Sequence, residues 1–217
     1  MKNIIFIAPP AAGKGTISEV LEHRFNLPHI STGDLLRDEI AHMTKLGTEI
    51  KDSMARGKFV SDEVITKLLK KRLSAKDCKK GYILDGYPRN INQAKEYEKM
   101  LEELSFDEGT VIYLKISKEE ALNRSMSRVI CPKCGATYNL SNIELSPLRE
   151  GLCDHCDSTL VTRSDDNEET FINRFDTYMK ETYPLIKYYE DKNNLLVVDV
   201  HGKSPEVIFE EIKKAIK

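Results

Sequence analysis

A short segment near the N-terminus has the residue types and spacing of a phosphate-binding loop. Residues 8–16 read APPAAGKGT, and this ending resembles that of the pattern G-x-x-x-x-G-K-[ST], although Ala8 stands where the pattern has its first glycine. In such loops, backbone N–H groups at a helix N-terminus converge on a phosphate, and the lysine adds a full positive charge. The segment therefore predicts phosphate binding by Lys14 and the backbone around it.

The missing first glycine does not exclude this function. Pro9 pushes the residue before it into the extended region, so Ala8 needs no left-handed freedom. Pro9 and Pro10 carry no N–H group, so the donors must come from about residues 11–16. The methyl group of Ala11 counts against phosphate binding, because it can crowd the cradle. The alternative, an incidental surface turn, is disfavoured by the apolar run before the loop and the amphipathic helical pattern after it.

Four of the five cysteines form two C-x-x-C pairs, which are Cys131 with Cys134 and Cys153 with Cys156. This spacing indicates a four-cysteine structural zinc site that leaves no open position for a catalytic water. Such an ion would fold a small lid that has too little apolar surface for its own core. Three alternatives remain open: free thiols or a redox pair, ligation by His155, and a nucleic-acid zinc ribbon, which the surrounding aspartates disfavour.

The remaining composition bounds the class of protein. A chain of 217 residues can form one core domain with small insertions. Lys and Arg total 33 against 35 Asp and Glu, a net charge of -2, so no global positive field favours nucleic acid. The early apolar run is too short for a signal peptide or a membrane span, and we expect a cytoplasmic protein with no membrane partner. Cys78 stands alone, and we interpret it as a packed or surface residue.

Apolar runs alternate with helical patterns along the chain, which predicts a doubly wound α/β sheet with five parallel strands. The expected strands lie at residues 3–8, 29–31, 82–84, 110–116 and 195–200. Ser117 and Glu120 predict a capping box, and Ser204 with Pro205 predicts the start of the last helix. Residues 31–60 and 127–166 interrupt the alternation, and we interpret them as a helical insertion and a loop-rich insertion.

Four further motifs follow the loop in order: STGDLLR at 31–37, GKFVSDEV at 57–64, LDGYPRNINQA at 84–94 and RSDDNEETFINR at 163–174. Together with the loop they resemble adenylate kinase, in the long form with a zinc-bearing lid, over essentially the whole chain. The resemblance implies a P-loop NTPase-type three-layer α/β/α fold. It also implies a core at 1–30, 61–126 and 167–217, an NMP-binding insertion at 31–60 and a zinc-binding lid at 127–166.

The resemblance also implies which residues form each part of the site. The positions that match ATP contacts are Ala11, Ala12, Gly13, Lys14, Gly15, Thr16, Arg124, Arg128, Thr137, Tyr138 and Lys203. Those that match AMP contacts are Thr32, Arg37, Lys58, Phe59, Val60, Gly86, Tyr87, Pro88, Arg89, Gln93, Arg163 and Arg174. The implied catalytic set is Lys14, Arg89, Arg128, Arg163 and Arg174, and Asp85 with Thr16 would orient Mg²⁺.

The implied reaction is ATP + AMP giving two ADP, with Mg²⁺ as cofactor, in a monomer that maintains adenine nucleotide levels. The sequence departs from the family at Ala8, Ala11, Val129, which replaces a frequent lid arginine, and Tyr87, where Phe is common. Two rival functions remain. The enzyme could use UMP, CMP or GMP as acceptor or GTP as donor, although Thr32 and Gln93 favour AMP. A nucleotide sensor without turnover is disfavoured because all the arginines of the implied catalytic set, which would clamp the phosphates, are present.

Overall fold

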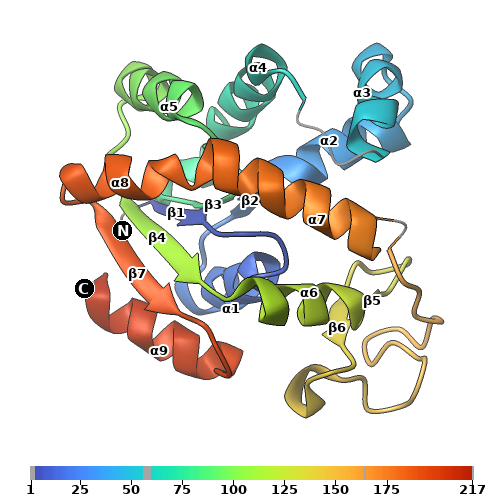
Figure 1. Cartoon of the computed structure of the whole chain (residues 1–217). Helices are drawn as coiled ribbons and strands as arrows, with labels where there is room; N and C mark the ends of the chain where they lie inside the picture. Colours follow the sequence, from blue (N-terminus) through green and yellow to red (C-terminus); the bar gives the residue numbers. More distant parts are fainter. Residues whose placement is uncertain (1–2, 56–59, 164, 217) are drawn as a thin grey trace.

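The computed structural model describes residues 3–55, 60–163 and 165–216. Its centre is a parallel sheet of five strands in the order β2-β3-β1-β4-β7 (Figure 1). The strands are β1 (Ile4–Ile7), β2 (His29–Ser31), β3 (Ile83–Asp85), β4 (Thr110–Lys115) and β7 (Leu195–Asp199). All five lie where the sequence predicts them, with ends that differ by at most one residue.

The sheet is covered on both faces, which explains why its strands are continuous apolar runs. All four residues of β1 are buried. Ile5 and Ile7 pack into one core cluster, whereas Ile4 and Phe6 pack into another, as the alternation of side chains along a strand requires. The molecule is therefore a three-layer α/β/α sandwich, as the sequence predicts.

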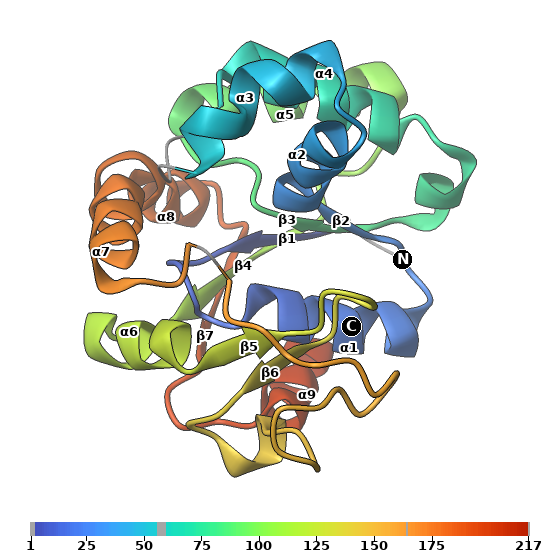
Figure 2. The ribbon, with the colours of Figure 1, turned by 90° about the vertical axis from the view of Figure 1, so that its right-hand side faces the viewer.

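Each layer of helices is built from separate parts of the chain (Figures 1 and 2). One face carries α1 (Lys14–Phe25) and α9 (Pro205–Ala215), which pack on each other and share a core cluster with β1. The other face carries α4 (Asp62–Leu73), α5 (Ile91–Leu104) and α8 (Pro184–Asp191). The 3₁₀ helix η1 (Lys76–Lys80) precedes β3, and the π-helix η3 (Tyr178–Thr182) joins α7 (Glu168–Thr177) to α8.

The structure agrees with the predicted helical insertion but adds strands to the predicted loop-rich one. Residues 31–60 contain α2 (Thr32–Ala41) and α3 (Lys45–Ala55), as expected for a helical insertion. Residues 127–166 are not only loop: β5 (Arg128–Ile130) and β6 (Thr137–Asn139) form an antiparallel pair, followed by the 3₁₀ helix η2 (Ile143–Leu145). Figure 2 shows this pair on the side of the sheet that carries α1 and α9.

Both helices begin where the sequence predicts, but their capping hydrogen bonds are incomplete. Helix α6 (Lys118–Met126) is capped by Ser117, whose hydroxyl accepts a hydrogen bond from the Glu120 N–H at 3.2 Å. The Glu120 carboxylate, however, does not return to the cap, because it pairs with Arg124 and His201. Pro205 is the first residue of α9, but the Ser204 side chain makes no capping hydrogen bond.

Within the described part of the chain, no helix combines the length and the apolar content that crossing a membrane requires.

Candidate active site

The carboxyl ends of the parallel strands open into a cleft of about 1030 Å³. In open parallel sheets ligands bind at this edge, where the strand order reverses. Here β3 and β4 flank β1 on opposite sides, so the loop after β1 lies at such a reversal. Of the predicted site residues, those that line the cleft are Ala11, Ala12, Gly13, Lys14, Gly15, Thr16, Arg37, Asp85, Gly86, Pro88, Arg89, Arg124, Arg128, Thr137, Tyr138, Arg163, Arg174 and Lys203.

The phosphate loop is shaped by two residues with left-handed backbone. Gly13, with φ 91°, caps α1, which begins at Lys14. Ala11 also has a positive φ, of 59°, although residues with a Cβ disfavour this region by about 1–2 kcal/mol. Ala8 does not have a positive φ, which confirms that glycine is dispensable there. The positive φ of Ala11, and not its methyl group alone, is what makes the departure from the family glycine costly at this position.

The Lys14 side chain turns back toward its own loop. Its Nζ donates to the carbonyl oxygens of Ala8 at 3.3 Å and Pro9 at 3.2 Å. Burial lowers the pKa of Lys14 to about 8; Asp85 opposes this shift, while Arg89 and two further arginines add to it. A cation held in such a costly position is stabilised when an anion enters the cleft.

Asp85 ends β3 and faces this cation. Its Oδ1 atom is buried and has no hydrogen-bond partner among the described residues. Thr16, at the start of α1, lines the same cleft and offers a hydroxyl oxygen. Hard divalent cations such as Mg²⁺ take oxygen ligands from carboxylates, substrate phosphates and water. The donor set at Asp85 and Thr16 therefore fits Mg²⁺.

Two of the predicted clamp arginines are held by neighbouring aspartates of the RSDD segment. Arg128 donates to Asp166 from Nε at 2.8 Å and also from Nη2, and the Asp166 side chain is fully buried. Arg174 donates to Asp165 at 2.7 Å. Burial, together with Arg128 and Arg37, lowers the pKa of Arg163. The arginines thus converge on one another as well as on the cleft, which concentrates positive charge there.

Arg89 is fixed by the turn that precedes it. Its Nε donates to the Gly86 carbonyl at 2.7 Å, and burial lowers its pKa to about 10. Gly86 has φ 82°, and a Cβ there would lie 2.6 Å from the Thr32 hydroxyl. Only glycine fits this close approach.

Four residues that the family resemblance assigns to AMP do not line the cleft. The Thr32 hydroxyl donates to the Gly86 carbonyl at 2.8 Å, Tyr87 shares a hydrogen bond of 3.0 Å with Thr66, and Val60 is buried in the core. The Gln93 side chain, 1% exposed, accepts from the Arg89 N–H at 2.7 Å and donates to Asp62 at 2.6 Å. These four side chains therefore pack against other parts of the protein and do not line the cleft.

Of the remaining residues that the resemblance assigns to AMP, Arg37 lies on α2. Arg37 lines the cleft and donates from Nε to Asp34 at 3.1 Å. Lys58 and Phe59, which were also assigned to AMP, lie outside the described residues.

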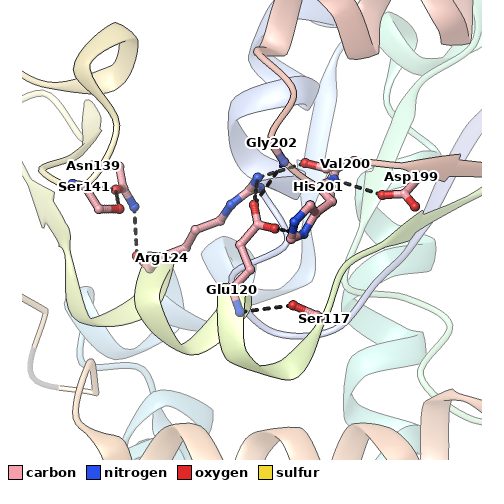
Figure 3. A network of polar contacts seen from close by, with 9 residues as sticks. All are labelled: Ser117, Glu120, Arg124, Asn139, Ser141, Asp199, Val200, His201 and Gly202. Carbon is pink, nitrogen blue, oxygen red and sulfur yellow. Dashed lines mark hydrogen bonds and ion pairs between the residues drawn. The ribbon is translucent and has the colours of Figure 1, made fainter.

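Outside the phosphate loop, the residues assigned to ATP lie on α6, in the lid and in the turn after β7. Arg124 donates to Glu120 and to the Val200 carbonyl at 2.8 Å (Figure 3). Lys203 donates to Glu211 at 2.7 Å. Tyr138 lies in the lid, where its hydroxyl accepts from the Asp154 N–H at 2.8 Å.

Thr137, beside Tyr138 in β6, donates to the Gly135 carbonyl at 3.5 Å. Both Thr137 and Tyr138 line the cleft, and Asn139, the next residue of β6, donates to the Arg124 carbonyl at 2.9 Å, so this part of the lid lies beside Arg124.

Sequence reasoning missed the acidic partners of the site. Asp165 and Asp166 lie inside the quoted RSDD motif but were used only as evidence against nucleic acid. Asp62 lies inside GKFVSDEV, and Glu120 was assigned to a helix cap. Asp62 and Asp166 have partners distant in sequence, and so does Glu120 in its contact with His201, so their spacing does not distinguish them from surface carboxylates. The pairing of Glu120 with Arg124 four residues later on one helix is a local signal that could have been recognised.

The four lid cysteines gather as the two C-x-x-C pairs predict. Their sulfur atoms all lie within 4.8 Å of one another, with Cys131 and Cys156 at 3.4 Å and Cys134 and Cys153 at 3.5 Å. Zn–S bonds of about 2.3 Å in a tetrahedron place sulfurs about 3.8 Å apart. The donor set therefore fits a structural zinc ion, and His155 is not part of the cluster.

A glycine-bearing loop between a buried parallel strand and a helix, beside an arginine-lined cleft at a strand reversal, defines a P-loop phosphotransferase. A family model described as adenylate kinase matches residues 6–194. The chain belongs to the adenylate kinase family.

Curated relatives agree along nearly the full length. The chain is 44% identical to an adenylate kinase of Caldanaerobacter subterraneus subsp. tengcongensis, over 98% of this chain and 95% of that protein. It is 43% identical to an adenylate kinase of Thermosipho africanus, over 91% of each chain. An adenylate kinase of Clostridium tetani is 41% identical, over 99% of this chain and 98% of that protein.

Proposed function

We propose that this protein transfers the γ-phosphoryl group of ATP to AMP, reversibly, and so forms two ADP. The observation that carries the proposal is the convergence of Lys14, Arg89, Arg128, Arg163 and Arg174 on one cleft at the carboxyl edge of the sheet. Such a concentration of cations would not contribute to the binding of a neutral ligand. It suits the polyphosphate that forms where two nucleotides meet.

The reaction needs alignment and charge neutralisation rather than a base. A phosphate oxygen of AMP is already anionic near neutral pH, so no proton must be removed before it attacks. Lys14 and the arginines would bind the equatorial oxygens of the transferring group and hold donor and acceptor in line. Because these donors are fixed in advance, they need no reorganisation as the charge moves.

The aspartates that hold the arginines leave donors for phosphate. A guanidinium has five N–H donors, and Asp166 occupies only Nε and Nη2 of Arg128. Asp165 occupies Nη1 of Arg174. We infer that Asp165 and Asp166 orient these side chains toward the cleft, so that less rotamer entropy is lost when nucleotides bind.

Two ions complete the proposal. Asp85 and Thr16 would hold Mg²⁺, directly or through water, and Mg²⁺ would neutralise charge on the donor phosphates. Cys131, Cys134, Cys153 and Cys156 would hold zinc, which would fold the lid and take no part in the chemistry.

We assign the donor to the end of the cleft at Arg124, Thr137, Tyr138 and Lys203, and the acceptor to the end at Arg37 and residues 86–89. The contacts of Thr32, Val60, Tyr87 and Gln93 favour a supporting role for them on the acceptor side. We propose 31–60 and 127–166 as the units that close over the nucleotides on the core formed by 1–30, 61–126 and 167–217. We further propose a cytoplasmic monomer with no nucleic acid or membrane partner.

The test is ADP formation by the purified protein from ATP and AMP with Mg²⁺. The expected result is turnover with this pair that exceeds turnover with GTP as donor or with UMP, CMP or GMP as acceptor. Nucleotide binding without ADP formation would instead support a sensor. Preference for another pair would contradict the assignment of substrates.

A further inference from the structure

Glu120 is a half-buried carboxylate that the phosphoryl-transfer proposal does not use. It lies in the first turn of α6, and its side chain is 17% exposed. Its Oε1 accepts from Arg124 Nη2 and, at 3.4 Å, from the N–H of Gly202, while its Oε2 pairs with Nδ1 of His201 (Figure 3). A single carboxylate thus contacts an arginine on its own helix and a turn some eighty positions further along the chain.

The groups that Glu120 contacts all belong to one end of the cleft. Glu120, Arg124, His201 and Gly202 line it, as does Lys203. A Cβ on Gly13 would lie 3.8 Å from Arg124 Nη1, so this guanidinium also borders the phosphate loop. Glu120 therefore joins α6 to the turn between β7 and α9, and it holds the arginine that borders the phosphate loop.

Glu120 adds to other hydrogen bonds at both contact groups: Arg124 donates to the Val200 carbonyl at 2.8 Å, and the His201 N–H donates to Asp199 Oδ1 at 2.9 Å. Arg124 has a long side chain whose ordering costs rotamer entropy, and Glu120 is the carboxylate that holds it. Gly202 has φ 62°, in a turn that contains no other buried charge partner for His201 among the described residues. The ion pair with Arg124 spans four residues of one helix, but its burial and its contacts with the turn distinguish it from an exposed surface pair.

We propose that Glu120 is a positioning residue for the donor nucleotide: it fixes Arg124 and the His201–Gly202 turn in the arrangement that receives ATP. This inference rests on the proposed function, which assigns that end of the cleft to the donor. In the proposed reaction Glu120 contacts no reacting atom. Its effect should therefore appear in donor affinity and not in the chemical step or in the acceptor site.

The test compares Glu120→Ala and Glu120→Gln with wild type. The control is Glu103→Ala, which removes an exposed interhelical ion pair with Lys70 away from the cleft. We expect Glu120→Ala to raise KM and the calorimetric Kd for ATP about tenfold, the effect of losing hydrogen bonds to a charged group. KM for AMP, kcat and the unfolding midpoint should stay near wild type. Glu120→Gln, which keeps one oxygen acceptor, should be intermediate, and Glu103→Ala should change neither affinity.

Several outcomes would overturn the proposal. An unchanged Kd for ATP would show that Arg124 and the turn are fixed without Glu120, and a lower Kd would show that Glu120 competes with the nucleotide. Equal losses for ATP and AMP, with a lower unfolding midpoint, would indicate a purely structural role. In an Arg124→Ala background the effect of Glu120→Ala should shrink, and full additivity would contradict action through Arg124.

Failure of this inference can be distinguished from failure of the proposed function. Calorimetric binding of ATP needs no turnover, whereas the proposed function is tested by ADP formation in the wild-type protein.

Discussion

The buried cation of Lys14 is a residue whose position becomes favourable when an anionic ligand binds. Its ammonium contacts two backbone carbonyls of its own loop and lies among arginines, with Asp85 as the opposing charge. A polyphosphate in the cleft would supply several anionic oxygens at this point. The same argument applies to the buried guanidinium of Arg89.

Replacement of Lys14 by Met removes this charge and keeps a side chain of similar length. We expect turnover to fall by about 10²-fold or more, the order found when one preorganised donor is lost, while the fold is kept. Steady-state ADP formation measures the effect, and Lys99→Met, on an exposed ion pair, serves as the control. Near-normal turnover would refute the role assigned to Lys14.

The pKa of Lys14 also predicts how stability depends on pH. Because this pKa falls from 10.5 in the unfolded chain to about 8 in the fold, the unfolded chain binds more protons between these values. The cost of burying the charge is therefore fully present below pH 8 and disappears as the pH rises toward 10.5. Lys14→Met should be more stable than wild type at pH 7.

Urea denaturation of both proteins from pH 7 to 10 checks this prediction, since other titrating groups cancel in the difference between them. The stability advantage of Lys14→Met should shrink over that range. A difference that does not depend on pH would contradict the lowered pKa.

At the scale of elements, the N-terminus of α4 is tied to the N-terminus of α5. The Asp62 carboxylate accepts from Asn90 Nδ2 at 3.0 Å and from Gln93 Nε2 at 2.6 Å. Gln93 in turn accepts from the backbone N–H of Arg89. The start of α4 is therefore linked through Gln93 to the backbone of Arg89, which the proposed function places at the acceptor.

Replacement of Asp62 by Ala leaves the buried Gln93 amide without its acceptor. We expect the free energy of unfolding to fall by about 1–3 kcal/mol, the cost of an unsatisfied buried donor. KM for AMP should rise while KM for ATP stays near wild type. Asp62→Asn, which keeps a carbonyl oxygen, should lose less. Equal changes in both KM values, or none, would contradict the link between α4 and the acceptor side.

The elements of the core could be predicted because each depends on local sequence. Apolar runs such as residues 4–7 are typical of strands covered on both faces. The spacing of the C-x-x-C pairs predicts that the four cysteines lie together. The β5–β6 pair was missed because its strands are three residues long and join residues on either side of a cysteine pair. The contacts of Asp62, Glu120 and Asp166 were missed because they depend on tertiary structure.

At the scale of the whole molecule, the core and the lid have different sources of stability. The core has two large apolar clusters, one on each face of the sheet. The described part of the lid has one small cluster, whose fully buried members are Cys131, Tyr138 and Cys153. Metal ligation at the four cysteines would therefore supply much of the folding free energy of the lid.

Removal of the metal by a strong chelator should make the lid unfold at a lower temperature than the core. Differential scanning calorimetry should then show a separate early transition, and Cys153→Ser should reproduce it without chelator. Cys78→Ser, outside the cluster, serves as the control. A thermal profile that the chelator does not change would contradict a structural metal in the lid.

The most direct measurement of the central claim is a crystal structure with a bisubstrate analogue that joins two adenosines through a polyphosphate. The account predicts the phosphates within hydrogen-bond distance of Lys14 and the backbone N–H groups of residues 13–16, between Arg89 and Arg128. It predicts one adenosine near Arg124 and the other near Arg37. A polyphosphate bound away from the loop after β1 would contradict the account.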